Sequence, residues 1–278
     1  MTNLWATSKP GSLNHLKNFP MVLVLGCSVL QVATWLAGWR QAGFEQTATY
    51  LGVAEMAFML LLLLNGWRIQ QHVQAVHASP MATQAAKWGL VSLALCTLGD
   101  LVNRNFGGQH FAYDKVIEHS YLADSVWFFL PGYLVWVVLA WKVAAPSVDR
   151  RIRLLTLALA AMAGLGSWYT LVLPGSSAYV VGITGAYSLV ITAMAAAGCW
   201  LLMAKGRVAW AVAMGAVAAT VADALIAQFW LFGHGHYPGI AHLNFALYFA
   251  SQALLQQLPL VLTQPVAHAK RTDRPNDN

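Results

Sequence analysis

The chain contains eight apolar stretches, each long enough to cross a lipid bilayer as an α-helix. One crossing needs about 20 predominantly apolar residues. Of the 278 residues, 58% are hydrophobic and 9% are charged, whereas a soluble domain carries about 25% charged residues. The sequence therefore predicts an all-α fold, a polytopic membrane helix bundle of eight transmembrane helices. We expect the helices at residues 20–39, 48–67, 86–103, 119–141, 154–173, 179–203, 208–232 and 241–263.

Basic residues are distributed unevenly between the two sides of this predicted bundle. Of the 16 Lys and Arg residues, 13 fall in the two termini and in or directly beside every second connection, and 3 fall in the other connections. Cytoplasmic segments carry the excess of Lys and Arg, so both termini are predicted to be cytoplasmic. The predicted organisation is a cytoplasmic segment 1–19, a transmembrane domain 20–263 and a polar tail 264–278 that we expect to be disordered.

The net charge of +6 follows from the same bias and does not imply a nucleic-acid partner. The expected surroundings are membrane lipid, in a bacterial inner membrane. The sequence carries no signal for an oligomeric state.

Polar side chains gather towards the non-cytoplasmic side of the predicted helices. A charge at the centre of a membrane helix costs about 2.5–3.5 kcal/mol, so acids there usually face a cavity and have a role. We infer a polar cavity in the bundle and regard Asp223, then Asp100, as the strongest functional candidates. For Gln256 an interhelical hydrogen bond is the simpler interpretation. For Glu55 and Asp124, an ordinary polar pair near the interface is an equally good one. The polar set includes Glu55, Asp100, Asp124, Tyr187, Asp223, Asn244, Tyr248, Gln252 and Gln256.

Two segments of the chain resemble each other at a separation of 123 residues. Thr97-Leu-Gly-Asp100 aligns with Thr220-Val-Ala-Asp223, and the same separation relates His119 to His242. This pattern predicts two parallel four-helix repeats, and repeat-built membrane proteins place their sites at the repeat interface. Two neighbouring carboxyl groups in a low-dielectric pocket cannot both ionise cheaply. One of them is then available to give a proton while the other directs water, as acid/base hydrolysis requires.

At these residues the chain resembles the YhhN-like lysoplasmalogenase family of multi-helix membrane proteins. The resemblance rests on Gly99-Asp100, on Ala222-Asp223-Ala-Leu-Ile-Ala227-Gln-Phe229, and on Tyr248-Phe-Ala-Ser-Gln252. The family's His-x-x-Tyr pattern is spaced differently here, as His119-Ser-Tyr121. The resemblance implies hydrolysis of the vinyl ether of a lysoplasmalogen, a lysophospholipid, to a fatty aldehyde and a glycerophospho-alcohol. It also implies Asp100 and Asp223 as the acidic pair, with Tyr248 and Gln252 in the pocket.

The residues and this chemistry fit together without a metal or a cofactor. One aspartate protonates the vinyl ether, and the other stabilises the resulting cation and guides water; the sequence leaves open which does which. We expect Asn244 and Gln252 to hold the water and Tyr248 or Tyr187 to line the headgroup end. The substrate's chain would enter between helices from the lipid. The remaining predicted substrate-binding residues are Glu55, Asp124, His119 and His242.

Three other functions compete with this one. A zinc-dependent lipid hydrolase is suggested by His234-Gly-His236 and His242, since intramembrane hydrolases use His and Asp as zinc ligands. A small-molecule or proton-coupled transporter would also use repeats and buried acids, although the chain lacks a pair of Gly/Pro-broken helices. A purely structural membrane protein is the third alternative. No Lys lies mid-helix to bind retinal, and no Ser or Cys lies in a nucleophile-elbow motif.

Overall fold

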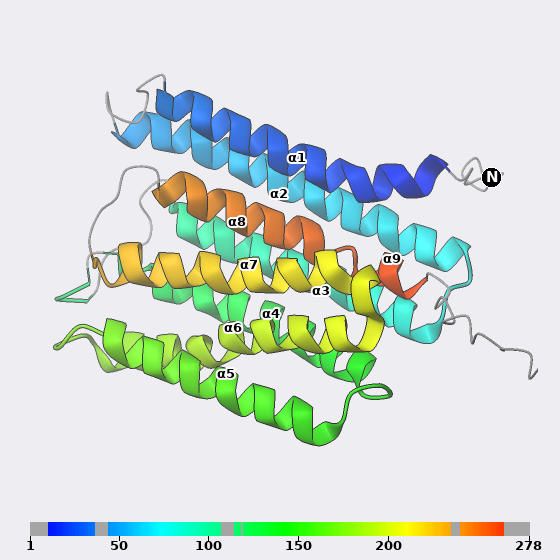
Figure 1. Cartoon of the computed structure of the whole chain (residues 1–278). Helices are drawn as coiled ribbons and strands as arrows, with labels where there is room; N and C mark the ends of the chain where they lie inside the picture. Colours follow the sequence, from blue (N-terminus) through cyan, green and yellow to red (C-terminus); the bar gives the residue numbers. More distant parts are fainter. Residues whose placement is uncertain (1–10, 37–43, 107–113, 118, 235–239, 264–278) are drawn as a thin grey trace, which may run out of the picture.

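The computed structural model describes residues 11–36, 44–106, 114–117, 119–234 and 240–263, and every regular element in these ranges is helical. The long helices alternate in direction along one bundle (Figure 1). Three shorter elements interrupt or extend them: a 3₁₀ turn η1 (Gly206–Ala209), a π-helical turn η2 (Ala227–Leu231) and α9 (Leu258–Leu262). The long helices are α1 (Gly11–Leu36), α2 (Phe44–Ala75), α3 (Pro80–Arg104), α4 (Leu122–Ala144), α5 (Arg150–Leu171), α6 (Ala178–Lys205), α7 (Trp210–Ile226) and α8 (Ile240–Leu255).

Six stretches of the described residues are long and apolar enough to cross a membrane. One of them, Ala178–Leu231, contains both α6 and α7. By length and composition the chain is therefore a multi-pass membrane protein. Eight crossings and cytoplasmic termini stay predictions, and the tail 264–278 lies outside the described residues.

Several helices begin or end away from the positions predicted from hydropathy. Helix α1 begins at Gly11, nine residues before the predicted apolar start, because a helix can extend beyond the apolar residues. Side-chain caps fix other starts: Ser79, Asp149 and Ser177 accept hydrogen bonds from the first turns of α3, α5 and α6. The predicted helix 241–263 is divided into α8 and α9, where Pro259 lies in the first turn of α9 and lacks a backbone donor.

Small residues bring the helices around the centre of the bundle into close contact. A Cβ atom at Gly198 would lie 2.9 Å from the Ala213 carbonyl oxygen, and one at Gly215 would lie 2.8 Å from the Cβ of Leu254. The α6–α7 and α7–α8 contacts therefore depend on small side chains, as is common between membrane helices. Helix α6 packs on α4, α5 and α7. In Figure 1, α5 and α1 lie at opposite edges of the bundle.

The predicted repeats correspond in part to the packing. Helix α2 packs on α3 and α3 on α4, as α6 packs on α7 and α7 on α8. The correspondence fails elsewhere, because α6 packs closely on α4 whereas the equivalent pair, α2 and α8, touches only slightly. The duplication stays a prediction.

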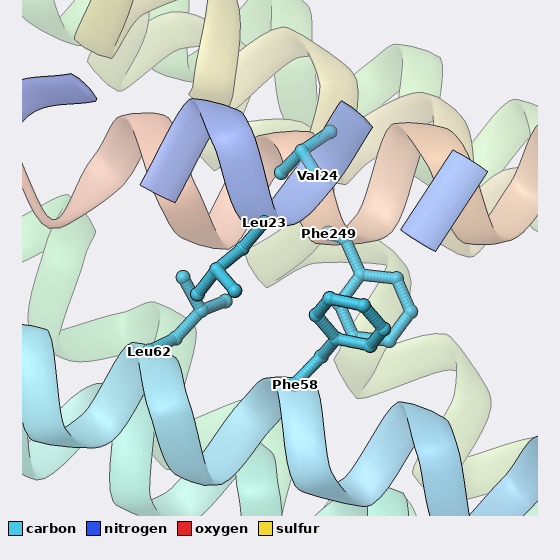
Figure 2. Close-up of a pocket in the computed structure, with 5 residues that line it drawn as sticks. All are labelled: Leu23, Val24, Phe58, Leu62 and Phe249. Carbon is cyan, nitrogen blue, oxygen red and sulfur yellow. The ribbon is translucent and has the colours of Figure 1, made fainter. Parts of the chain in front are cut away.

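A small apolar gap separates α1, α2 and α8 (Figure 2). Its empty volume is about 150 Å³, and it is lined by Leu23, Val24, Phe58, Leu62 and Phe249. The rings of Phe58 and Phe249 lie 6.2 Å apart. All five side chains are hydrocarbon, so this gap offers no group for acid/base chemistry.

Candidate active site

Asp100 lies on α3 and is hydrogen-bonded to a residue near the C-terminal end of the chain. The Tyr248 hydroxyl, on α8, donates a hydrogen bond of 2.6 Å to its Oδ2 atom. Asp100 is half-buried. The sequence-predicted pair Asp100 and Tyr248 is therefore brought together by contact between the first and second halves of the chain.

Asp223 lies on α7 and is 7% exposed. The Tyr187 hydroxyl, on α6, donates a hydrogen bond of 3.0 Å to its Oδ2 atom. A second phenol, Tyr133 on α4, lies near this carboxyl group, and its ring stacks on that of Tyr187. Gln252 on α8 donates a hydrogen bond of 3.2 Å to the Tyr133 hydroxyl. The Asp223 carboxyl group is therefore held by Tyr187 and lies beside the hydrogen-bonded pair Tyr133–Gln252.

Aromatic rings and one thiol fill the space between the two aspartates. The Tyr133 ring stacks on Phe129 and on Tyr187, with centroids 6.2 and 6.3 Å apart. The Phe129 ring also meets Tyr248 edge to face at 6.1 Å. The buried Cys96 thiol interacts with both aspartates, and the charge of Asp223 acts on Asp100. The two carboxyl groups are thus linked through one cluster of packed aromatic rings.

An ion pair lies one helical turn from Asp100. Arg104 on α3 pairs with Glu55 on α2, which is 2% exposed. The Arg104 guanidinium also lies 4.4 Å from the centroid of the Phe245 ring. Glu55, which the sequence placed in the substrate site, is therefore engaged with Arg104, whose charge also acts on Asp100.

A cleft lies beside this site. Residues of α4, α5, α6 and α7 line it, and it encloses about 790 Å³ of empty space, its open side included. Asp223 and Tyr187 form part of its wall, as does Asn103. The Oδ1 atoms of Asn103 and of Asn244 are buried and have no hydrogen-bond partner among the described residues. Each is therefore free to accept a hydrogen bond from water or from a hydroxyl group.

Other predicted site residues lie apart from the aspartate pair. Asp124, at the start of α4, accepts a 2.8 Å hydrogen bond from Tyr179. The ring of His119 meets Tyr121 with centroids 5.9 Å apart, and within the described ranges we find no contact between His119 and either aspartate. The side chain of His242 lies outside the described residues. Gln256 accepts a hydrogen bond of 3.0 Å from Asn65, an interhelical bond of the kind expected.

The sequence interpretation missed Tyr133, Arg104 and Asp114. Tyr133 follows Pro131-Gly132 inside an apolar run and lies far from Asp223 in the sequence, so no local pattern connects the two residues. Arg104 was counted only for topology, although it stands four residues after Asp100 on the same helical face.

Asp114 links two connections between helices. Its Oδ1 atom accepts hydrogen bonds from the backbone of Val116 and Ile117, and its Oδ2 atom accepts one of 2.6 Å from Ser177. Burial alone raises the pKa of Asp114, but the hydrogen bonds from Ser177, Val116 and Ile117 outweigh it and lower the pKa to about 2. Asp114 therefore fixes the α3–α4 connection to the start of α6.

The sequence profile of the YhhN family matches residues 52–258. The chain belongs to the YhhN family. No curated protein and no solved structure matches the chain. The YhhN match includes both aspartates, the three phenols Tyr133, Tyr187 and Tyr248, and the Glu55–Arg104 pair.

The metal-binding alternative finds no support in the described part of this YhhN protein. No group of three or more His, Cys, Asp and Glu side chains there is arranged to hold a metal ion. His234 is exposed, and its Nε2 atom lies 2.7 Å from the Leu171 carbonyl oxygen. His236 and the side chain of His242, the other predicted ligands, lie outside the described residues.

Proposed function

We propose that this YhhN protein is a membrane hydrolase of the lysoplasmalogenase type. It cleaves the vinyl ether bond of a lysoplasmalogen and releases a fatty aldehyde and a glycerophospho-alcohol. The observation that carries the proposal is the aspartate pair. Asp100 and Asp223 each accept a hydrogen bond from a phenol, packed aromatic rings join the two groups, and Asp223 lines a mostly apolar cleft.

The reaction uses the pair as acid and base. The protonated aspartate transfers its proton to the β-carbon of the vinyl ether, and the double-bond electrons form the new C–H bond. An oxocarbenium ion results, with its positive charge shared between the α-carbon and the ether oxygen. Water attacks the α-carbon, and one of its protons passes to the ionised aspartate. The product of this step is a hemiacetal. A proton then moves to the ether oxygen, the C–O bond breaks, and the hemiacetal hydroxyl loses its proton to give the aldehyde.

The surroundings of the pair suit an oxocarbenium intermediate. A buried carboxylate stabilises a nearby cation more strongly than one in water, because the local dielectric constant is lower. The Tyr187 phenol holds Asp223 in a fixed position before the charge develops. The unpartnered Oδ1 atom of Asn244, one helical turn before Tyr248 on α8, is suited to accepting a hydrogen bond from the attacking water.

The proposal includes eight crossings, cytoplasmic termini and a bacterial inner membrane. With that orientation the aspartate pair lies in the non-cytoplasmic half of the bundle. A membrane-embedded site is appropriate, because a single-chain lipid is concentrated in the bilayer. Metal-free chemistry by the two aspartates is part of the same proposal.

A panel of lysolipids tests the activity. Purified protein is incubated with vinyl-ether, alkyl-ether and ester forms that share one headgroup, and aldehyde and fatty acid are measured. We expect aldehyde from the vinyl ether alone, and loss of it in Asp100→Asn and in Asp223→Asn. Asp124→Asn is the matched control, since Asp124 belongs to a separate hydrogen-bond network. Fatty acid from the ester form contradicts the proposal, and flux across liposomes without any product favours a transporter.

A further inference from the structure

The cleft beside Asp223 has one closed end and one open side. It runs along α6, from Thr184 near the helix start to Thr192 about 12 Å further, at 1.5 Å per residue. At the Thr192 end α5 and α6 meet closely, since a Cβ atom at Gly164 would lie 2.6 Å from the Thr192 Oγ1 atom. The cleft therefore ends there, inside the bundle.

The open side follows from the position of α5. Helix α5 packs on α6 at the edge of the bundle (Figure 1). Only Arg153 and Gly164 of α5 are buried. With α4 and α6 lining its inner wall, the cleft opens between α5 and α7, towards the surface that the membrane's hydrocarbon would cover.

The wall of the cleft is rich in hydroxyl groups, and most of them are already engaged. Thr184, Ser188 and Thr192 each donate to a backbone carbonyl of their own helix, at 2.6–2.8 Å. Thr220 donates to the Ile191 carbonyl at 2.7 Å, and the Trp168 indole donates to Thr184 at 3.0 Å. These groups turn methyl, methylene and ring surface towards the cleft. A hydrocarbon chain can lie on such a wall without leaving a donor unsatisfied.

Groups with free polar capacity lie elsewhere on the wall. They are the carboxyl group of Asp223 and the unpartnered Oδ1 atom of Asn103. Asn103 lies near the end of α3, on the side where α4 and α6 begin. A lysolipid therefore has its polar end towards Asn103, its reactive bond at Asp223 and its chain along the engaged hydroxyls.

The closed end is too near Asp223 to contain that chain. Thr220, the deepest lining residue of α7, is one helical turn from Asp223, about 4.5 Å at 1.5 Å per residue. One lipid chain reaches across half of a hydrocarbon core of about 30 Å, or about 15 Å. The chain must then leave the cleft through its open side.

We propose that the cleft between α5 and α7 is the binding site for the single hydrocarbon chain of the substrate, and that the chain leaves sideways into the bilayer. This inference rests on the proposed function for the identity of the lipid. The enzyme is then selective for the reactive bond at Asp223 and for the polar end at Asn103, and it tolerates different chain lengths. Only the first few methylene groups beyond the vinyl ether contact the protein.

A photoreactive lipid tests the site without any turnover. The probe is a lysolipid with an uncleavable alkyl ether and a diazirine on the chain a few carbons from the ether. After illumination of the wild-type protein, labelled peptides are mapped by mass spectrometry. We expect labels on the cleft-facing residues of α5, α6 and α7. Labels concentrated on Leu23 and Phe58, in the gap between α1 and α2, overturn the proposal, as does uniform labelling of all lipid-facing residues.

A pair of tryptophan variants tests the same site by kinetics. Ser167 is exposed and lines the cleft, whereas Gly166 is its neighbour on α5 and has no atom within 4 Å of a Cβ position. Ser167→Trp should lower kcat/KM for a hexadecenyl substrate by about 10-fold or more, the effect of two methylene groups no longer buried. Gly166→Trp should stay within about twofold of wild type. Equal kinetics for the two variants overturn the chain site.

The outcomes separate this inference from the proposed function. Wild-type protein that releases no aldehyde but is labelled along the cleft overturns the proposed function and supports the chain site. Aldehyde release together with labels elsewhere supports the proposed function and overturns the chain site. For wild type we also expect similar kcat/KM for dodecenyl, hexadecenyl and octadecenyl chains, and a sharp cut-off at one chain length contradicts sideways exit.

Discussion

Tyr187 donates a hydrogen bond of 3.0 Å to Asp223 from the neighbouring helix, and Tyr133 approaches the same carboxylate from α4. The position of Asp223 is thus set by three helices together. This arrangement makes the phenols as informative to change as the carboxylate itself, because they alter its hydrogen bonds without altering its identity.

Tyr187→Phe tests the hydrogen bond to Asp223. A hydrogen bond to a charged group contributes about 1.5–3 kcal/mol, so we expect kcat/KM for the vinyl-ether substrate to fall roughly 10- to 150-fold. Tyr169→Phe is the control, since Tyr169 is 79% exposed, and it should behave as wild type. Equal activity of Tyr187→Phe and wild type would show that the Tyr187 hydrogen bond does not contribute to the reaction.

Arg104→Gln tests the buried ion pair with Glu55. Removing one partner leaves the Glu55 charge buried without compensation, which costs about 3–5 kcal/mol of folding stability. We expect a clear fall in the melting temperature of the purified protein in detergent. The double variant Glu55→Gln with Arg104→Gln should recover part of that loss, and a double variant less stable than Arg104→Gln would show that the pair is not the cause.

Gly215→Ala tests the close approach of α7 and α8. The added Cβ atom would lie 2.8 Å from the Leu254 Cβ atom, and overpacking of this kind costs about 1–3 kcal/mol. Since α7 carries Asp223 and α8 carries Tyr248, activity should fall with thermal stability. Gly182→Ala, at an exposed glycine with open space around it, should leave both unchanged or slightly raise stability.

Asp114→Asn tests the link between two connections. The pKa of Asp114 is lowered to about 2, so its carboxylate contributes stability above its unfolded pKa of about 3.9. That contribution is lost as the pH falls from about 4 towards 2. We expect Asp114→Asn to have a lower melting temperature than wild type at pH 6, with the difference vanishing near pH 2. A difference that persists at pH 2 contradicts the link through the charged carboxylate.

A chelator test separates the aspartate scheme from a zinc hydrolase. Dialysis of the purified protein against a strong zinc chelator should leave aldehyde release unchanged. Metal analysis of the same sample provides the measurement of bound zinc. Stoichiometric zinc that is lost together with activity would establish the zinc alternative.

Hydropathy predicted the helices well but not their ends. A run of apolar residues reports where hydrocarbon surrounds the chain, whereas the ends depend on caps and on proline. This is why α1 begins at Gly11 and why Ser79 and Asp149 determine starts that hydropathy alone does not locate. The π-helical turn η2, within the predicted helix 208–232, also has no hydropathy signal. Such turns occur often near functional sites, and this one begins four residues after Asp223.

The site was predictable where a polar residue stood out in an apolar run. Asp100, Asp223, Tyr187 and Tyr248 were identified in that way, and the structure brings them together in two hydrogen-bonded pairs. Tyr133 was not, because one phenol among aromatic residues resembles ordinary core packing. Which helices face each other is decided by packing over the whole bundle, and a single sequence does not encode that in any local pattern.

The contact between Tyr248 and Asp100 has a consequence for how the protein is made. The chain is synthesised from its N-terminus at about 5–20 residues per second, so the 148 residues that separate them take roughly 7–30 s. During that interval α3 must be accommodated by the insertion machinery with its carboxyl group lacking the Tyr248 phenol. Helix α8 completes the site last, and truncation before α8 leaves Asp100 without that partner.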